Sequence, residues 1–136
     1  SSADVASAAN TIGCSSAEIS DSSWHGTRTA GIVGALSQNG AGISGVDWNA
    51  RILPVRVLGR CGGFTSDIVS GMRWAAGLTS DVGSSVPVVN DHPAKVLNLS
   101  LGSQGACSLA YEEVMQELAT AGVTVVVAAG NDAGLE

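Results

Sequence analysis

Charged residues are scarce in this sequence. Only 13% of its 136 residues are charged, and six Lys and Arg stand against twelve Asp and Glu, which gives a formal net charge of −6. Because a nucleic-acid-binding protein needs clustered cations to neutralise phosphates, this composition argues against nucleic acid as a partner. Long apolar runs are also absent from the sequence. The longest, residues 123–129, is far shorter than the roughly 20 residues of a membrane-spanning helix, so we predict no membrane partner.

Cysteine is sparse and odd in number. Cys14, Cys61 and Cys107 lie far apart without C-x-x-C spacing, which argues against a zinc knuckle or a redox pair. Three cysteines form at most one internal disulfide, so one thiol is either free or bonded outside this chain. Residues 1–4 show neither a positively charged nor an apolar targeting segment, so we expect any targeting peptide to have been removed. These features predict a secreted, extracellular protein of which further sequence is missing here.

The 45% hydrophobic content is enough to bury the core of one domain or part of one. A loop-rich entry, residues 1–23, precedes a core, residues 24–132, in which helical and strand-like apolar patterns alternate. The expected elements in chain order are a helix 25–37, a strand 52–58, a helix 66–78, a strand 96–99, a helix 108–121 and a strand 123–129. We expect Ser23 to cap the first helix and Gly122 to end the third.

This alternation predicts an α/β fold of three layers, in which a parallel sheet with right-handed crossovers carries helices on both faces. The apolar run 123–129 is typical of a central strand that is covered on both sides. Ligands bind at the carboxyl ends of the strands in such sheets. The rule points to residues 100–102 and 130–132, which directly follow two of the predicted strands.

Two weaker patterns argue for no function of their own. Residues 40–45 satisfy G-x-G-x-x-G, but they follow a helix and precede a strand, which is the reverse of the dinucleotide-binding context. His92 stands between Asp91 and Pro93 in a polar loop, as expected of a solvated turn residue.

His25 begins the first predicted helix and is followed by small residues, including Gly26 and Gly31. These residues allow the helix to pack closely while the imidazole faces a cleft. The local sequence alone leaves open a structural histidine, which is the commoner case, or a general base.

The wider sequence carries four motifs of one family. The stretch SWHGTRTAG, residues 23–31, resembles the histidine motif H-G-T-x-V-A-G of the subtilases, with Thr29 in the place of valine. VLNLSLG, residues 96–102, resembles their substrate-binding strand V-I-N-x-S-L-G, and residues 123–132 resemble G-V-x-V-V-x-A-A-G-N.

The fourth motif comprises residues 53–59, the glycine pair 62–63 and residues 71–75, which resemble the subtilase strand, edge loop and helix beside the upper substrate subsites. All four follow the chain order of the family between residues 23 and 132. The sequence therefore resembles the central portion, residues 1–136, of one peptidase domain of a subtilisin-like serine protease of peptidase family S8.

The resemblance implies a serine endopeptidase with a Ser-His-Asp triad. His25 would be the general base, because an imidazole can accept the serine proton and return it to the leaving amine. Asn131 would donate its side-chain amide to the oxyanion, an interaction typically worth about 10²–10³ in turnover. Spacing alone leaves Asn131 equally open to capping a turn, since Gly-Asn-Asp is ordinary turn chemistry.

The resemblance also implies where a peptide or protein substrate binds. Backbone groups of Ser100, Leu101 and Gly102 would pair with an extended substrate, and Gly62 and Gly63 would offer a second edge. Leu101 would help to line the P1 and P4 pockets. A roomy P1 cavity would be left by the small residues Ala128, Ala129 and Gly130, although these also suit the simple end of a buried strand.

The resemblance requires no cofactor for catalysis but leaves room for a structural calcium. Asn39 aligns with a calcium-loop position of some subtilases, although the sequence has no Asp-x-Asp-x-Asp-Gly pattern. Cys61 and Cys107 fall in regions that flank the same cleft, so their disulfide is the preferred pairing, with Cys14–Cys61 second.

Neither the aspartate motif nor the Gly-Thr-Ser-Met-Ala nucleophile motif of the family occurs in the sequence. Asp4 and Asp21 lack a preceding apolar strand. We therefore expect the chain to be inactive alone and to have as partners the remaining N- and C-terminal segments of the same domain, which would also cover strands otherwise left as exposed edges. A noncatalytic peptide-binding remnant and an unrelated flavodoxin-like α/β domain are the alternatives.

Overall fold

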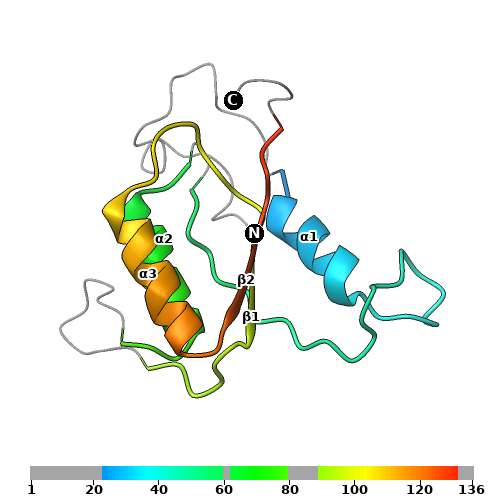
Figure 1. Ribbon diagram of the computed structural model, residues 1–136. Coiled ribbons are helices and arrows are strands. Elements are labelled where there is room, and N and C mark those ends of the chain that lie inside the picture. Colours follow the sequence, from blue (N-terminus) through cyan, green and yellow to red (C-terminus); the bar gives the residue numbers. More distant parts are fainter. Residues whose placement is uncertain (1–22, 60–61, 80–88, 132–136) are drawn as a thin grey trace. The chain divides into compact units, whose positions relative to one another are not determined.

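The computed structural model describes residues 23–59, 62–79 and 89–131. The chain divides into two compact units, one of residues 1–54 and 58–62 and the other of residues 55–57 and 63–136. The described part of unit 1 contains the helix α1 (His25–Gly34). Unit 2 contains α2 (Thr65–Ala75), β1 (Val96–Leu99), α3 (Leu109–Thr120) and β2 (Thr124–Val127) (Figure 1).

The two strands of unit 2 pair in parallel, with Val96 opposite Thr124 and Leu99 opposite Val127. Parallel neighbours need a crossover connection, and α3 provides it. In Figure 1 α3 lies beside β2 and against α2, so both helices cover one face of the strands. The predicted α/β class with parallel strands and helices is confirmed.

One apolar core holds unit 2 together. Val114 and Leu118, one helical turn apart on α3, are fully buried, and α3 contacts β2. Burying such a side chain contributes about 1.5–3 kcal/mol. The buried apolar residues of the described ranges are Ile68, Val69, Met72, Ala75, Ala76, Leu97, Val114, Leu118 and Val123.

Gly122 ends α3 as predicted, and it does so in a Schellman motif. Its φ of 71° is left-handed, its own N–H donates to the carbonyl of Ala119 at 3.0 Å, and the N–H of Val123 donates to that of Leu118 at 2.9 Å. Only glycine adopts this conformation without a steric penalty. The chain is thereby turned directly from α3 into β2.

The first helix begins at His25 as predicted, but its N-cap and its end differ from the prediction. Its N-cap is Trp24 rather than Ser23, although the Ser23 hydroxyl still accepts the N–H of His25 at 3.4 Å. The helix ends at Gly34 rather than at residue 37. The chain that returns explains why the helix ends at Gly34. The N–H groups of Val46 and Asp47 take the carbonyls of Ile32 and Val33, which residues 36 and 37 of a longer helix would need.

The predicted strand 52–58 is wrong, since the structure assigns no strand to these described residues. The two strands assigned among the described residues, β1 and β2, pair with each other. The apolar character of the segment serves packing instead. Val55 and Val57 lie against α2 at Gly71, where an added Cβ would come 2.4 Å from Cγ1 of Val57.

The second helix is also shorter than predicted, Thr65–Ala75 against 66–78. Gly77, with a φ of 75°, ends it in a second Schellman motif, in which the N–H of Leu78 donates to the carbonyl of Arg73 at 2.9 Å.

We predicted that the last strand is buried on both faces, but within unit 2 only one face of it is covered. The strand covers Thr124–Val127 rather than 123–129, and Val126 and Val127 are 51% and 54% exposed. Because α2 and α3 cover only one face, the other face presents Val96, 60% exposed, beside Val126. This second face thus exposes apolar side chains, as in sheets that carry a further layer.

Asn90 ties the segment before β1 to the end of α2. Its amide nitrogen donates to the carbonyls of Trp74 and Ala75, each at 3.1 Å, and its side-chain carbonyl accepts the N–H of His92 at 2.9 Å. The side chain is 9% exposed, so these helix-end carbonyls are satisfied by protein groups.

We predict that Asn90→Ala destabilises the full-length protein by about 2 kcal/mol, because it removes the three hydrogen bonds of a buried side chain, while the N–H groups of Gly77 and Ala94 still donate to the carbonyls of Trp74 and Ala75. Denaturant unfolding measures the loss. Asn49→Ala, at an exposed position, is the matched control and should stay close to wild type. Equal effects of both substitutions would show that the buried contacts of Asn90 contribute nothing particular.

Candidate functional site

His25 is the first residue of α1 and is exposed in unit 1. It follows Trp24, whose φ of 53° is rare for a bulky residue and costs roughly 1–2 kcal/mol. The Arg28 guanidinium donates to the carbonyl of Ser23, and the Thr29 hydroxyl donates to that of Gly26 at 3.0 Å. Local bonds thus fix the helix start that carries the imidazole. No pattern in the sequence signals the left-handed Trp24.

Unit 2 brings two of the predicted substrate segments to one edge of its sheet. Leu99 and Val127 end their strands opposite each other, and the N–H of Ala128 donates to the carbonyl of Leu99 at 3.1 Å. Residues 100–102 and 128–131 therefore leave the sheet side by side, as the carboxyl-end rule predicts.

Within this edge Leu101 is half-buried, whereas Gly102, Ala128, Ala129, Gly130 and Asn131 are exposed. Gly130 has a φ of 91°, in the region that favours glycine. It turns the chain immediately before Asn131, whose exposed side chain takes no part in the core of unit 2.

The glycine pair lies in a narrow turn. Gly59 and Gly62 form an antiparallel bridge, with the N–H of Gly59 donating to the carbonyl of Gly62 at 2.7 Å. Gly62 has a φ of 114° and Gly63 follows it in an exposed stretch.

The site residues are divided between the two units: Gly62 and His25 belong to unit 1, and Gly63 and Asn131 belong to unit 2. The convergence of His25 with Asn131 accordingly stays a prediction.

Sequence reasoning missed Asn98, the polar residue in the middle of β1. Its amide nitrogen donates to the Ser100 hydroxyl at 2.8 Å. The period-2 geometry of a strand could have signalled this contact, since residues 98 and 100 face the same side.

The cysteine, calcium and turn predictions are only partly covered by the described residues. Cys107 is an exposed, free cysteine, whose sulfur lies 3.9 Å from the carbonyl of Ser108, while Cys14 and Cys61 fall outside the described residues.

The side-chain carbonyl of Asn39 accepts the N–H of Ala41 at 3.1 Å. Among residues 23–59, 62–79 and 89–131, no three His, Cys, Asp or Glu side chains group as metal ligands. Over the same ranges no helix is long and apolar enough to cross a membrane.

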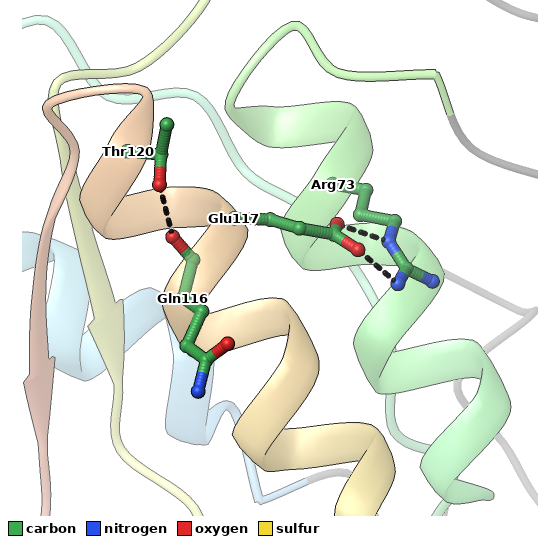
Figure 2. A network of polar contacts seen from close by, with 4 residues as sticks. All are labelled: Arg73, Gln116, Glu117 and Thr120. Carbon is green, nitrogen blue, oxygen red and sulfur yellow. Dashed lines mark hydrogen bonds and ion pairs between the residues drawn. The ribbon is translucent and has the colours of Figure 1, made fainter.

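An ion pair lies between the helices of unit 2. The Arg73 guanidinium donates through Nε to Oε2 of Glu117 at 2.6 Å and through a terminal nitrogen to Oε1 at 2.7 Å (Figure 2). The hydrogen bond from Arg73 lowers the pKa of Glu117, and the same bond raises the pKa of Arg73. On α3 the Thr120 hydroxyl donates to the carbonyl of Gln116 at 2.8 Å. The Arg73–Glu117 pair joins α2 to α3.

We predict that Glu117→Gln slightly lowers the stability of the full-length protein at pH 7, because both side chains are partly exposed. The lowered pKa means that the stabilisation exists above the ordinary carboxyl value of 4.5 and is lost as the pH falls below it. Thermal unfolding from pH 7 to pH 3 should show the variant and wild type converging. In an Arg73→Gln background the second substitution should add nothing; an undiminished effect there would contradict the pairing.

Parallel strands joined by a helix, with motif-bearing segments at their carboxyl ends, define an α/β protein. The family described as the subtilase family matches residues 5–136. The chain belongs to this family.

Relatives and a solved structure agree with this assignment. Over 112 residues the chain is 48% identical to an "Extracellular protease" of Xanthomonas campestris pv. campestris. The matched region covers 82% of this chain and 19% of the relative. The chain is 45% identical over 111 residues to an "Extracellular basic protease" of Dichelobacter nodosus, over 82% of this chain and 18% of the relative. A solved structure from work on proteases of Pseudoalteromonas arctica PAMC 21717 matches with a TM-score of 0.81 and 46% identity, over 96% of this chain and 37% of that one. The chain thus spans about a fifth of these two curated relatives.

Proposed function

We propose that the protein containing this chain is a secreted serine endopeptidase that hydrolyses peptide bonds of extracellular proteins. The observation that carries the proposal is the shared sheet edge, where residues 100–102 and 128–131 emerge side by side through the Ala128–Leu99 hydrogen bond. Family membership and relatives named as extracellular proteases support it.

In the proposed reaction His25 is the general base. Its imidazole takes the proton of a serine hydroxyl as that oxygen attacks the scissile carbonyl, and it later returns the proton to the leaving amine. An aspartate holds the imidazole in the required tautomer. The serine and the aspartate come from flanking segments of the same domain, which is why we expect residues 1–136 alone to be inactive.

Asn131 is the oxyanion donor in this proposal. The tetrahedral intermediate carries negative charge on the former carbonyl oxygen, and a fixed amide N–H aimed at that oxygen stabilises it more than it stabilises the substrate. The positive φ of Gly130 supports this role, because it turns the chain immediately before Asn131.

The substrate binds as an added strand. Ser100, Leu101 and Gly102 pair with it through backbone groups on one side, and Gly62 and Gly63 do so on the other. Ala128, Ala129 and Gly130 leave space for a large P1 side chain. No cofactor takes part in the chemistry. A structural calcium and a Cys61–Cys107 disulfide belong to the same proposal.

A fluorophosphonate probe tests the proposal, since it reacts with activated serines. The full-length protein should be labelled and should cleave a chromogenic peptide. His25→Ala should abolish both, whereas the matched His92→Ala, at an exposed turn position, should retain both. Absence of labelling in the wild-type protein would overturn the proposal and favour a peptide-binding remnant.

A further inference from the structure

Asn98 is an unexpected residue for its position. It stands in the middle of β1, where the neighbouring residues Leu97 and Leu99 point to the buried side and Asn98 to the exposed one. Its register partner on β2 is Val126, and Val96 precedes it on the same face. The amide therefore shares this face with Val96, Val126 and Thr124.

This face is suited to being covered. Val96 and Val126 are 60% and 51% exposed, and parallel sheets of α/β proteins carry layers on both faces. Once covered, an amide without a partner would be costly, because burial removes its water. The Ser100 hydroxyl, 2.8 Å from the Asn98 amide nitrogen, supplies that partner within the same segment.

We propose that Asn98 is a positioning residue for substrate binding. By donating to the Ser100 hydroxyl it fixes residue 100 at the point where the strand ladder stops, after Leu99, and so sets the direction of the backbone of residues 100–102. The inference rests on the proposed function, in which that backbone pairs with an extended peptide.

The hydrogen bond from Asn98 to Ser100 predicts an effect on kcat/KM that depends on the length of the substrate. A peptide substrate that extends to P4 uses the backbone of residues 100–102, whereas a small activated ester uses only the reacting centre. Asn98→Ala should lower kcat/KM for the extended peptide about fivefold, the size of one lost hydrogen bond, and leave ester hydrolysis nearly unchanged. The loss should fall mainly on KM.

The test uses the full-length protein with Asn98→Ala, Ser100→Ala and the double variant. Both single variants should show the same peptide-selective loss, and the double variant should show no further loss. Val126→Ala, on the same face and in register with Asn98, is the matched control; it should lower the melting temperature but keep the ratio of peptide to ester hydrolysis.

Equal losses with peptide and ester, or independent losses from the asparagine and serine variants, would overturn the inference. Should Asn98→Ala fail to fold, Ser100→Ala decides alone, since it removes the acceptor and must show the peptide-selective loss. A wild-type protein that is not labelled by fluorophosphonate contradicts the proposed function itself, whereas a labelled wild type with an unselective Asn98→Ala contradicts only the positioning role.

Discussion

His25→Ala in the full-length protein is expected to lower kcat by about 10⁶-fold, the size known for removal of the histidine from a subtilisin triad. Without the imidazole, the attacking serine keeps its proton at neutral pH and the leaving amine receives none. Stopped assays with a chromogenic peptide measure this loss. KM should change little, because His25 lies outside the segments that pair with the substrate.

The structure makes this substitution easy to interpret. His25 is exposed and α1 buries no residue within unit 1, so its removal leaves no cavity in that unit. The melting temperature should therefore stay near that of wild type, as should that of His92→Ala, the histidine control. A kcat within tenfold of wild type would show that another group serves as the base.

Asn131→Ala is expected to lower kcat by about 10²–10³-fold, which is the cost known for loss of one oxyanion donor in a subtilisin. The amide acts on charge that appears only in the transition state, so kcat and kcat/KM should fall together. Asn131→Asp should be equally slow, because a carboxylate keeps the shape but donates no hydrogen bond.

Fluorophosphonate labelling separates this role from a structural one. Asn131 is exposed after β2, so its truncation should not unfold the protein. The variant should still be labelled, since His25 still activates the serine, although more slowly. If Asn131→Ala retains full kcat, the residue caps a turn and the oxyanion donor is another group.

The elements of unit 2 were predictable because their signals are local. β1 is a short apolar run, and α3 shows Val114 and Leu118 at helical spacing before Gly122, whose left-handed φ only glycine adopts readily. The confirmed features therefore come from residues that decide their own conformation.

Other features depend on contacts that periodicity does not encode. The end of α1 is set by residues 45–47, which return from further along the chain to take its carbonyls. The segment 52–58 has the apolar pattern of a strand, but its Val55 and Val57 pack against α2 at Gly71. Asn90 and the Arg73–Glu117 pair join segments 15 and 44 residues apart, so no local pattern indicates them.

In the candidate site, too, some features are predictable from the sequence and others are not. The rule that ligands gather at strand ends selected residues 100–102 and 130–132, and the register confirms that the segments after β1 and β2 adjoin. The contact of Asn98 was missed, because a polar residue within a strand of apolar residues indicates no partner until its hydrogen bond to Ser100 is seen. His25 depends on the family motif, since a lone histidine carries no spacing information.

A crystal structure of the full-length protein with a peptide boronate bound to its serine tests the central claim most directly. The account predicts that the amide nitrogen of Asn131 lies about 2.7–3.1 Å from the boronate oxygen that mimics the oxyanion. It also predicts an imidazole nitrogen of His25 within about 3.2 Å of the serine oxygen. A structure in which these two side chains lie on opposite faces of the sheet, with no groove between them, would contradict it.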